Sequence, residues 1–94
     1  MIGNIVKVIV DRPLGSVHPK HNDLIYNVNY GYIPEVFALD GEEQDAYILG
    51  VNEPVKEFTG KVIAIINRVD DEEKLIVSNK YFSKEEILKQ VYFQ

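Results

Sequence analysis

The sequence predicts a mainly β domain: an OB-like, five-stranded antiparallel barrel with one C-terminal α-helix. Short apolar runs rich in β-branched residues alternate with turn-rich segments along most of the chain, and only the last segment has a helical period. A small flat sheet would leave long unpaired edges, whereas a barrel closes on itself. Because 94 residues suffice for one modest core, we expect residues 1–94 to form a single domain.

Two strands and the loop between them are predicted in the first part of the chain. The segment 4–11, NIVKVIVD, is rich in β-branched residues and stops at the turn sequence RPLGS, so we expect a strand. Residues 17–23, VHPKHND, lack periodicity and are predicted to be a loop. In 25–36, IYNVNYGYIPEV, one face carries Tyr and Val and the other Ile, Asn and Gly, until Pro34 ends any ladder pairing.

Three further strands are predicted in the second half of the chain. They are 45–51 (DAYILGV), 61–69 (KVIAIINRV) and 74–78 (KLIVS). The sequence DDEE between the last two indicates a hairpin. Because the acidic turns 40–45 and 70–73 each flank a predicted strand, both can open on the same rim of the barrel.

The final segment, SKEEILKQVYF, is predicted to be an amphipathic helix that covers one end of the β domain. Ser83 is a candidate N-cap, and Glu86 three residues later completes a capping box. The expected apolar face consists of Ile87, Leu88, Val91 and Tyr92.

Composition excludes several classes of function. With 15 acidic against 10 basic side chains and a formal charge of −5, the chain has no general attraction to nucleic acids or anionic membranes, and we expect neither partner. The absence of cysteine excludes disulfides, thiolate metal ligands and a cysteine nucleophile. Without a basic leader or a long apolar run, the protein is expected to be soluble and cytoplasmic.

Carboxylates crowd the segment DGEEQDAYILG, which contains Asp40, Glu42 and Asp45. Such close carboxylates repel one another unless water or a cation offsets their charge. Mg²⁺ binds oxygen donors and needs only a few protein carboxylates when a substrate phosphate completes its shell. A solvated acidic turn is the alternative, although Asp45 heads an apolar strand, where a carboxylate has little structural reason to be.

A second acidic cluster precedes the last predicted strand. Asp70, Asp71, Glu72 and Glu73 follow one another, and Lys74 begins the strand. Taken alone, this is an ordinary polar hairpin loop. Its interest lies in its pairing with the first cluster.

The segment YNVNYGYIP is dense in phenol and amide groups, at Tyr26, Asn29, Tyr30 and Tyr32. These groups can hydrogen-bond phosphate oxygens or a metal-bound water. Alternating tyrosines are also common in plain sheet packing, so both explanations stay open.

Basic residues near the start of the chain have similar alternatives. Arg12 follows an apolar strand and could clamp a phosphate with two hydrogen bonds, or simply be solvated. His18, Lys20 and His21 could bind metal or phosphate, or neither. The chain has no GxxxxGK phosphate loop and no nucleophile elbow, which leaves metal and water as the candidate chemistry.

Taken together, VDRPLG, YNVNYGYIP, DGEEQDAYILG and DDEEKLIV resemble, in order and approximate spacing, the core of the soluble family I inorganic pyrophosphatases. The resemblance covers about residues 8–77 and fits a short, truncated or divergent member. It implies an OB-like barrel, a Mg²⁺ cofactor with Mn²⁺ as a possible substitute, and pyrophosphate or another phosphorylated small molecule as substrate.

The resemblance also implies roles for particular residues. The implied metal ligands are Asp40, Glu42, Asp45, Asp70, Asp71 and Glu72. The implied substrate-binding residues are Arg12, Asn29, Tyr30 and Lys74. The implied catalytic residues are Asp40, Tyr30 and Asp45.

The sequence also departs from the family pattern. The family normally has Asp where Glu42 and Glu72 stand, and the extra methylene changes the reach of each carboxylate toward a metal with tight geometry. Gln44 replaces an apolar signature residue. A preceding hairpin with a lysine and glutamates, and a later tyrosine–lysine pair, have no convincing match here.

Two functions are therefore predicted as alternatives. The first is a Mg²⁺-dependent pyrophosphatase-like hydrolase in which metal-activated water attacks a phosphoanhydride, with Lys20 and the two histidines standing in for missing lysines. The second is a catalytically degenerate barrel that binds metal and a phosphate or nucleotide without turnover. Apolar surface left by the missing family hairpin makes a homo-oligomer an expectation in either case.

Overall fold

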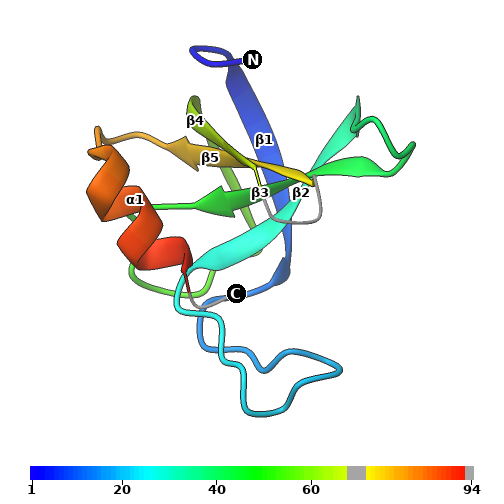
Figure 1. Ribbon diagram of the computed structural model, residues 1–94, viewed down its shortest axis with the longest axis vertical. Helices are drawn as coiled ribbons and strands as arrows, with labels where there is room; N and C mark the ends of the chain where they lie inside the picture. The colour runs from blue at the N-terminus through cyan, green and yellow to red at the C-terminus, as the bar shows by residue number, and fades with distance from the viewer. Residues whose placement is uncertain (68–71, 93–94) are drawn as a thin grey trace.

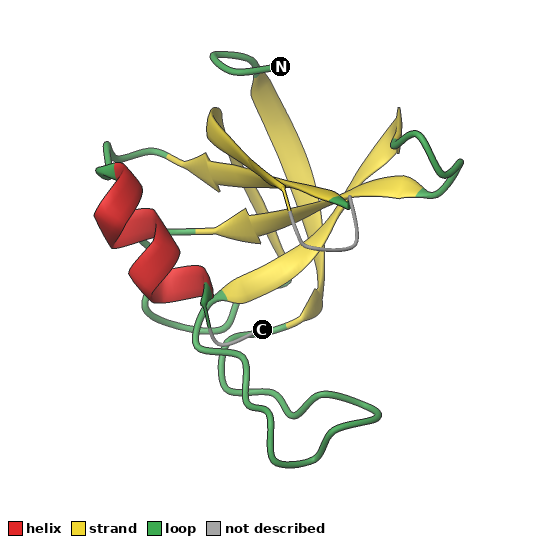
Figure 2. Cartoon of the chain, viewed as in Figure 1, coloured by secondary structure: helices red, strands yellow, loops and turns green. Residues whose placement is uncertain are grey.

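The computed structural model describes residues 1–67 and 72–92. In these residues it contains the strands and helix β1 (Ile5–Arg12), β2 (Asn29–Phe37), β3 (Glu43–Ile48), β4 (Glu57–Asn67), β5 (Glu73–Ser78) and α1 (Lys84–Val91). The strands close into a barrel in the order β1-β2-β3-β5-β4, with α1 outside it (Figures 1 and 2). The predicted OB-like barrel with one C-terminal helix is confirmed. No helix of the described part is long and apolar enough to cross a membrane.

One pair of neighbouring strands in the barrel, β3 and β5, is parallel. Ala46 lies beside Leu75 and Ile48 beside Val77, whereas the other four strand pairings are antiparallel. A closed ring with an odd number of strands cannot alternate direction all the way round. Closure of this barrel therefore requires the parallel contact within the predicted antiparallel architecture.

The strands β3 and β5 are buried on both faces, which explains their continuous apolar sequences. Their inward side chains fill the barrel with those of the other strands: Val8, Ile33, Ala46, Ile48, Val62, Leu75 and Val77. Their outward side chains pack with α1 in a second cluster: Val28, Tyr47, Leu49, Ile76, Ile87 and Val91. The alternation of side chains along each strand thus builds one core inside the barrel and another beneath the helix.

The helix α1 begins as the sequence predicts. The Ser83 hydroxyl accepts the Glu86 N–H at 3.2 Å, and the Glu86 carboxylate accepts the Ser83 N–H at 2.9 Å, so the capping box is confirmed. The predicted apolar face is too wide, because Leu88 is 38% and Tyr92 80% exposed. Only Ile87 and Val91 of that face are buried, as expected for residues four apart on an eight-residue helix.

Pro34 interrupts the ladder of β2 without ending the strand. Ile33 pairs with Gln44 and the next pair is Phe37 with Glu43, so residues 34–36 form a bulge. Glu35 adopts a left-handed conformation with φ 64°, and its N–H donates to the Glu43 carboxylate at 2.9 Å. This bulge shapes the β2–β3 hairpin that projects from the barrel (Figure 1).

The strand β4 begins four residues before the predicted segment 61–69. Its first part, from Glu57 to Lys61, pairs with β1, and its later part pairs with β5. Sequence reasoning missed the first part because EFTG resembles a turn. Because β4 pairs with both β1 and β5, it joins the first and last strands of the sheet and closes the barrel.

Gly31 is required where β2 pairs with β1, because a Cβ at this position would overlap the carbonyl oxygen of Ile9. We therefore expect Gly31→Ala to lower the free energy of unfolding by about 3 kcal/mol or more, measured by urea denaturation. Gly60→Ala is the matched control, because its Cβ would meet the movable ring of Phe58 at 2.6 Å. Equal losses in the two variants would contradict this explanation.

Candidate functional site

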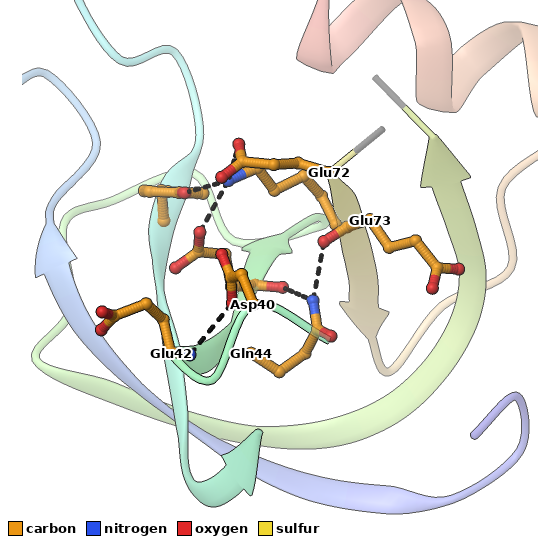
Figure 3. A network of polar contacts seen from close by, with 8 residues as sticks. Asp40, Glu42, Gln44, Glu72 and Glu73 are labelled. Atoms are coloured by element: carbon orange, nitrogen blue, oxygen red, sulfur yellow. Dashed lines mark hydrogen bonds and ion pairs between the residues drawn. The ribbon is translucent and has the colours of Figure 1, made fainter. Parts of the chain in front are cut away.

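The β2–β3 hairpin and the start of β5 meet at one rim of the barrel. They enclose a cleft of about 360 Å³ lined by Ala38, Leu39, Asp40, Glu42, Glu43, Gln44, Asp45, Glu72, Glu73 and Lys74. The expectation that the two acidic segments share a rim is confirmed for the described residues (Figure 3). Asp70 and Asp71, predicted as metal ligands, lie outside the described residues.

Lys74 is the buried centre of this rim, with 4% of its surface exposed. Its ammonium lies 2.6 Å from the Asp45 carboxylate, donates to the Tyr30 hydroxyl at 2.9 Å and lies 3.4 Å from the Glu72 carboxylate. It also lies 5.4 Å from the centre of the Tyr30 ring. A buried ammonium is stable only with such partners, so the three side chains fix one another.

The parallel register of β3 and β5 brings Lys74 and Asp45 together. Ala46 pairs with Leu75, and the residues preceding these two in each strand are Asp45 and Lys74. Across the antiparallel ladder, Tyr30 of β2 pairs with Tyr47 of β3. The ring centres of Tyr30 and Tyr47 lie 4.8 Å apart. Because Tyr47 belongs to the cluster beneath α1, called the outer core from here on, Tyr30 links the site to that core.

The proton distribution at the rim follows from this geometry. Burial lowers the pKa of Lys74, but its hydrogen bond to Asp45 and the charges of Asp45 and Glu72 outweigh burial and raise it. Burial, followed by the charge and hydrogen bond of Asp45, also raises the pKa of Tyr30. The rim therefore holds a charged ammonium and a neutral phenol side by side, both able to donate hydrogen bonds.

The remaining acidic residues of the hairpin are tied to the backbone. Asp40 accepts the Glu42 N–H at 3.0 Å and so closes the turn, while the Glu43 carboxylate supports the bulge. Glu42 and Glu72 line this cleft and also a neighbouring cleft bordered by Tyr32 and Phe37, and Figure 3 shows their side chains. These contacts orient the loop and leave carboxylate oxygens at the cleft.

Two polar residues have structural roles that the sequence did not reveal. Gln44 is buried, and its side-chain N–H groups donate to the Glu73 carbonyl at 2.8 Å and the Asp45 carbonyl at 3.1 Å (Figure 3). Asn29 is fully buried and uses its amide to bind backbone groups of Leu14, Glu53 and Val55. The available signal for the burial of Gln44 was that it stands where the family pattern has an apolar residue.

Arg12 and the predicted loop residues lie on the other side of Tyr30. Arg12, His18 and Lys20 line a separate cleft of about 410 Å³ that also borders Tyr30, Asp45 and Lys74. The lining of this cleft does not include His21, whose ring lies 4.9 Å from that of His18. Tyr26, predicted as a possible phosphate ligand, is buried and stacks on Tyr30 at 5.7 Å.

Comparison with known proteins supports the fold and not the sequence family. No protein-family model and no curated protein matches the chain. The crystal structure of an inorganic pyrophosphatase from Ehrlichia chaffeensis is similar with a TM-score of 0.75 at 17% identity, over 99% of this chain and 80% of that one. This barrel has the pyrophosphatase fold.

Two further solved structures share this pyrophosphatase fold. An inorganic pyrophosphatase from Neisseria gonorrhoeae gives a TM-score of 0.71 at 23% identity, over 97% of this chain and 72% of that one. An inorganic phosphatase from Anaplasma phagocytophilum gives a TM-score of 0.61 at 20% identity, over 79% of this chain and 56% of that one. The resemblance stated from the sequence is thus confirmed in the fold, which by itself does not assign chemistry.

The acidic rim of this pyrophosphatase fold has the donor chemistry for a hard divalent cation. Asp40, Glu42, Asp45 and Glu72 border one cleft, and Lys74 is the one cationic side chain among the described residues that line the acidic rim. In residues 1–67 and 72–92, no group of three acidic or histidine side chains converges closely enough to hold a metal ion. The rim therefore suits a divalent cation in the type of its ligands and in its excess of negative charge, but not in a converging geometry of the described carboxylates.

Removing the main partner of Lys74 tests the electrostatics of the rim. In Asp45→Asn, the hydrogen bond and charge that help to outweigh burial are lost, and burial, already the largest single influence, should lower the pKa of Lys74 below the ordinary lysine value. The measurement is a pH titration of the Lys74 side-chain carbon signals by NMR. Glu72→Gln should lower this pKa less, because Glu72 lies farther away at 3.4 Å. An unchanged Lys74 titration in Asp45→Asn would contradict the assignment.

Proposed function

We propose that this protein is a pyrophosphatase-like hydrolase that binds a small phosphoanhydride, with pyrophosphate as the simplest substrate, at the rim around Lys74. The observation that carries the proposal is the buried ammonium at the mouth of an acidic cleft. A phosphate group carries several negative oxygens and needs fixed cations and hydrogen-bond donors. Lys74 supplies the charge and Tyr30 an adjoining neutral hydroxyl.

Lys74 can receive a phosphate oxygen at little cost. Its three donors face Asp45, Tyr30 and Glu72, and the Glu72 contact is the longest at 3.4 Å. A phosphate oxygen that takes the place of Glu72 keeps the ammonium fully hydrogen-bonded, while Asp45 continues to orient it. The side chain of Arg12, across the Tyr30 ring, binds oxygens that Lys74 does not reach.

The cofactor in this proposal is Mg²⁺, or Mn²⁺ in its place. Asp40, Glu42, Asp45 and Glu72 would hold it, together with Asp70 and Asp71 of the segment outside the described residues. When bound, the cation lowers the pKa of water and neutralises charge on the leaving phosphate. The carboxylates of this rim also repel anions that arrive without a cation, which favours a metal–substrate complex as the species bound.

A second candidate function is binding of the same ligand without turnover. Two observations favour it: the described carboxylates do not converge on one point, and Asp45 is already neutralised by Lys74. Such a protein would bind a phosphate or nucleotide with a divalent cation and leave the anhydride intact. Separate measurements of turnover and of binding distinguish the two functions.

Divalent cation binding is expected to stabilise the protein. Mg²⁺ in excess over its Kd should raise the thermal unfolding midpoint, because the folded rim gathers carboxylates that the unfolded chain separates. Asp40→Asn should reduce this increase, whereas Asp23→Asn, in the 17–23 loop, should leave it unchanged. Identical increases in wild type and Asp40→Asn would place the cation elsewhere.

The decisive test is phosphate release from pyrophosphate with Mg²⁺. Lys74→Met should reduce kcat/KM by about 10²- to 10³-fold, because it removes the buried charge that faces the developing phosphate. Lys74→Met also leaves Asp45 without its cationic partner, so the free energy of unfolding should fall by about 1 to 3 kcal/mol, and circular dichroism checks that the variant is folded before it is assayed. Lys7→Met is the matched control, because Lys7 pairs with Glu57 on the exposed surface.

The outcomes separate the two candidate functions. Hydrolysis that is lost in Lys74→Met and kept in Lys7→Met supports the hydrolase. Absence of hydrolysis in wild type, with calorimetric binding of pyrophosphate that Lys74→Met abolishes, supports the binding protein. Wild-type protein that neither hydrolyses nor binds pyrophosphate overturns both.

A further inference from the structure

The bulge in β2 places Phe37 on the same face of the β2–β3 hairpin as Tyr32. In a regular strand, residues five positions apart lie on opposite faces. The bulge changes this, because Phe37 forms the ladder pair that directly follows the pair of Ile33. Side chains alternate along the ladder, so Phe37 shares the face of Tyr32, and both residues line a cleft of about 460 Å³, which we call the aromatic cleft.

The bulge is held in a conformation that non-glycine residues seldom adopt. Glu35 has φ 64°, and its N–H donates to the Glu43 carboxylate at 2.9 Å. Backbone conformations of this kind cost free energy and concentrate at functional sites. Phe37 is 64% exposed and belongs to neither core cluster, so its placement by the bulge does not serve the packing of the barrel.

The aromatic cleft lies against the acidic rim. The two clefts share five lining residues: Asp40, Glu42, Glu43, Asp45 and Glu72. Tyr32 pairs with Asp45, whose carboxylate lies 2.6 Å from the Lys74 ammonium. Phe37 is two ladder positions beyond Tyr32, about 7 Å along the strand. A ligand with a phosphate at Lys74 that extends past Tyr32 by the length of a sugar therefore meets Phe37.

The lining of the aromatic cleft suits the base of such a ligand. An exposed aromatic ring binds any nucleobase by stacking, because every base has a π-face. Apart from Tyr32, Phe37 and Gly41, the described lining consists of carboxylates, which repel a further phosphate and accept N–H groups. The aromatic cleft thus fits an uncharged, planar, N–H-bearing group better than a second anion.

We propose that Phe37 forms a base-binding site, so that the ligand of this protein is a nucleoside phosphate with its phosphates at Lys74 and its base stacked on the Phe37 ring. The proposal rests on the proposed function, since Lys74 binds the phosphates. Phe37 then acts as a specificity residue that distinguishes a nucleotide from pyrophosphate.

The test uses calorimetric titrations with Mg²⁺ and two probes that share a diphosphonate group: α,β-methylene-ADP, which carries adenosine, and methylene diphosphonate, which does not. Wild-type protein should bind the nucleotide about tenfold more tightly, the effect of one stacked base. Phe37→Ala should remove this advantage and leave the affinity for methylene diphosphonate unchanged. Tyr81→Ala is the matched control, because Tyr81 is 89% exposed and lines a separate cleft.

A second measurement observes the stacking directly. The chain contains no tryptophan, so Phe37→Trp introduces a single indole. A stacked base contacts the indole ring, so α,β-methylene-ADP should quench its fluorescence and methylene diphosphonate should not. If Phe37→Ala unfolds by circular dichroism, this measurement decides in its place.

Each result has a distinct meaning. Equal affinity of wild type for the two probes, or undiminished nucleotide affinity in folded Phe37→Ala, overturns the base-binding site and leaves the proposed function intact. An equal loss of both probes in Phe37→Ala also overturns it, because the change then acts on the phosphates. A smaller sedimenting species in Phe37→Ala than in wild type assigns the ring to a contact between copies of the chain, and overturns it as well. Wild-type protein that binds neither probe overturns the proposed function and the base-binding site with it.

Discussion

The parallel contact between β3 and β5 is the constraint on which both the barrel and the site depend. A ring with an odd number of strands needs one such contact to close. The same register places Asp45 beside Lys74, which are 29 positions apart in the sequence, with 2.6 Å between their charged groups. A shift of one residue in this register would turn one partner toward the other face of the sheet and leave a buried ammonium unpaired.

Burial of β3 and β5 on both faces determines where the site lies. In the later part of these strands α1 covers the outward side chains of Tyr47 and Ile76. At the start of the strands the helix no longer covers the sheet, and the outward positions are taken by Asp45 and Lys74. Tyr30 and Tyr47 connect the two regions through contact between their rings. The site is thus the polar continuation of the outer core, which explains how a nearly buried lysine retains access to a cleft.

Two clefts meet at this lysine, one lined mainly by carboxylates and one in which basic side chains lie beside Asp11 and Asp45. On the side of the β2–β3 hairpin the lining is carboxylate-rich and suits a cation, and on the side of the 17–23 loop it contains Arg12, His18 and Lys20 and suits an anion. A cation–phosphoanhydride complex combines both kinds of charge, which is the physical basis of the proposed ligand. The solved pyrophosphatases share the fold of this barrel, and a shared fold does not by itself assign a ligand.

The sequence by itself determined the local elements and the kinds of chemistry available. β-branched runs, turn residues and the Ser83–Glu86 capping box predicted the strands and the start of the helix, because each depends on neighbouring residues. It also supplied the acidic segments and Lys74 as site candidates. It could not determine that Leu88 and Tyr92 are exposed, that Gln44 bridges two strands, or that Nδ1 of His18 is used by its own loop. Those properties depend on contacts between residues brought together only by strand register and loop folding, and the tertiary structure alone decided them.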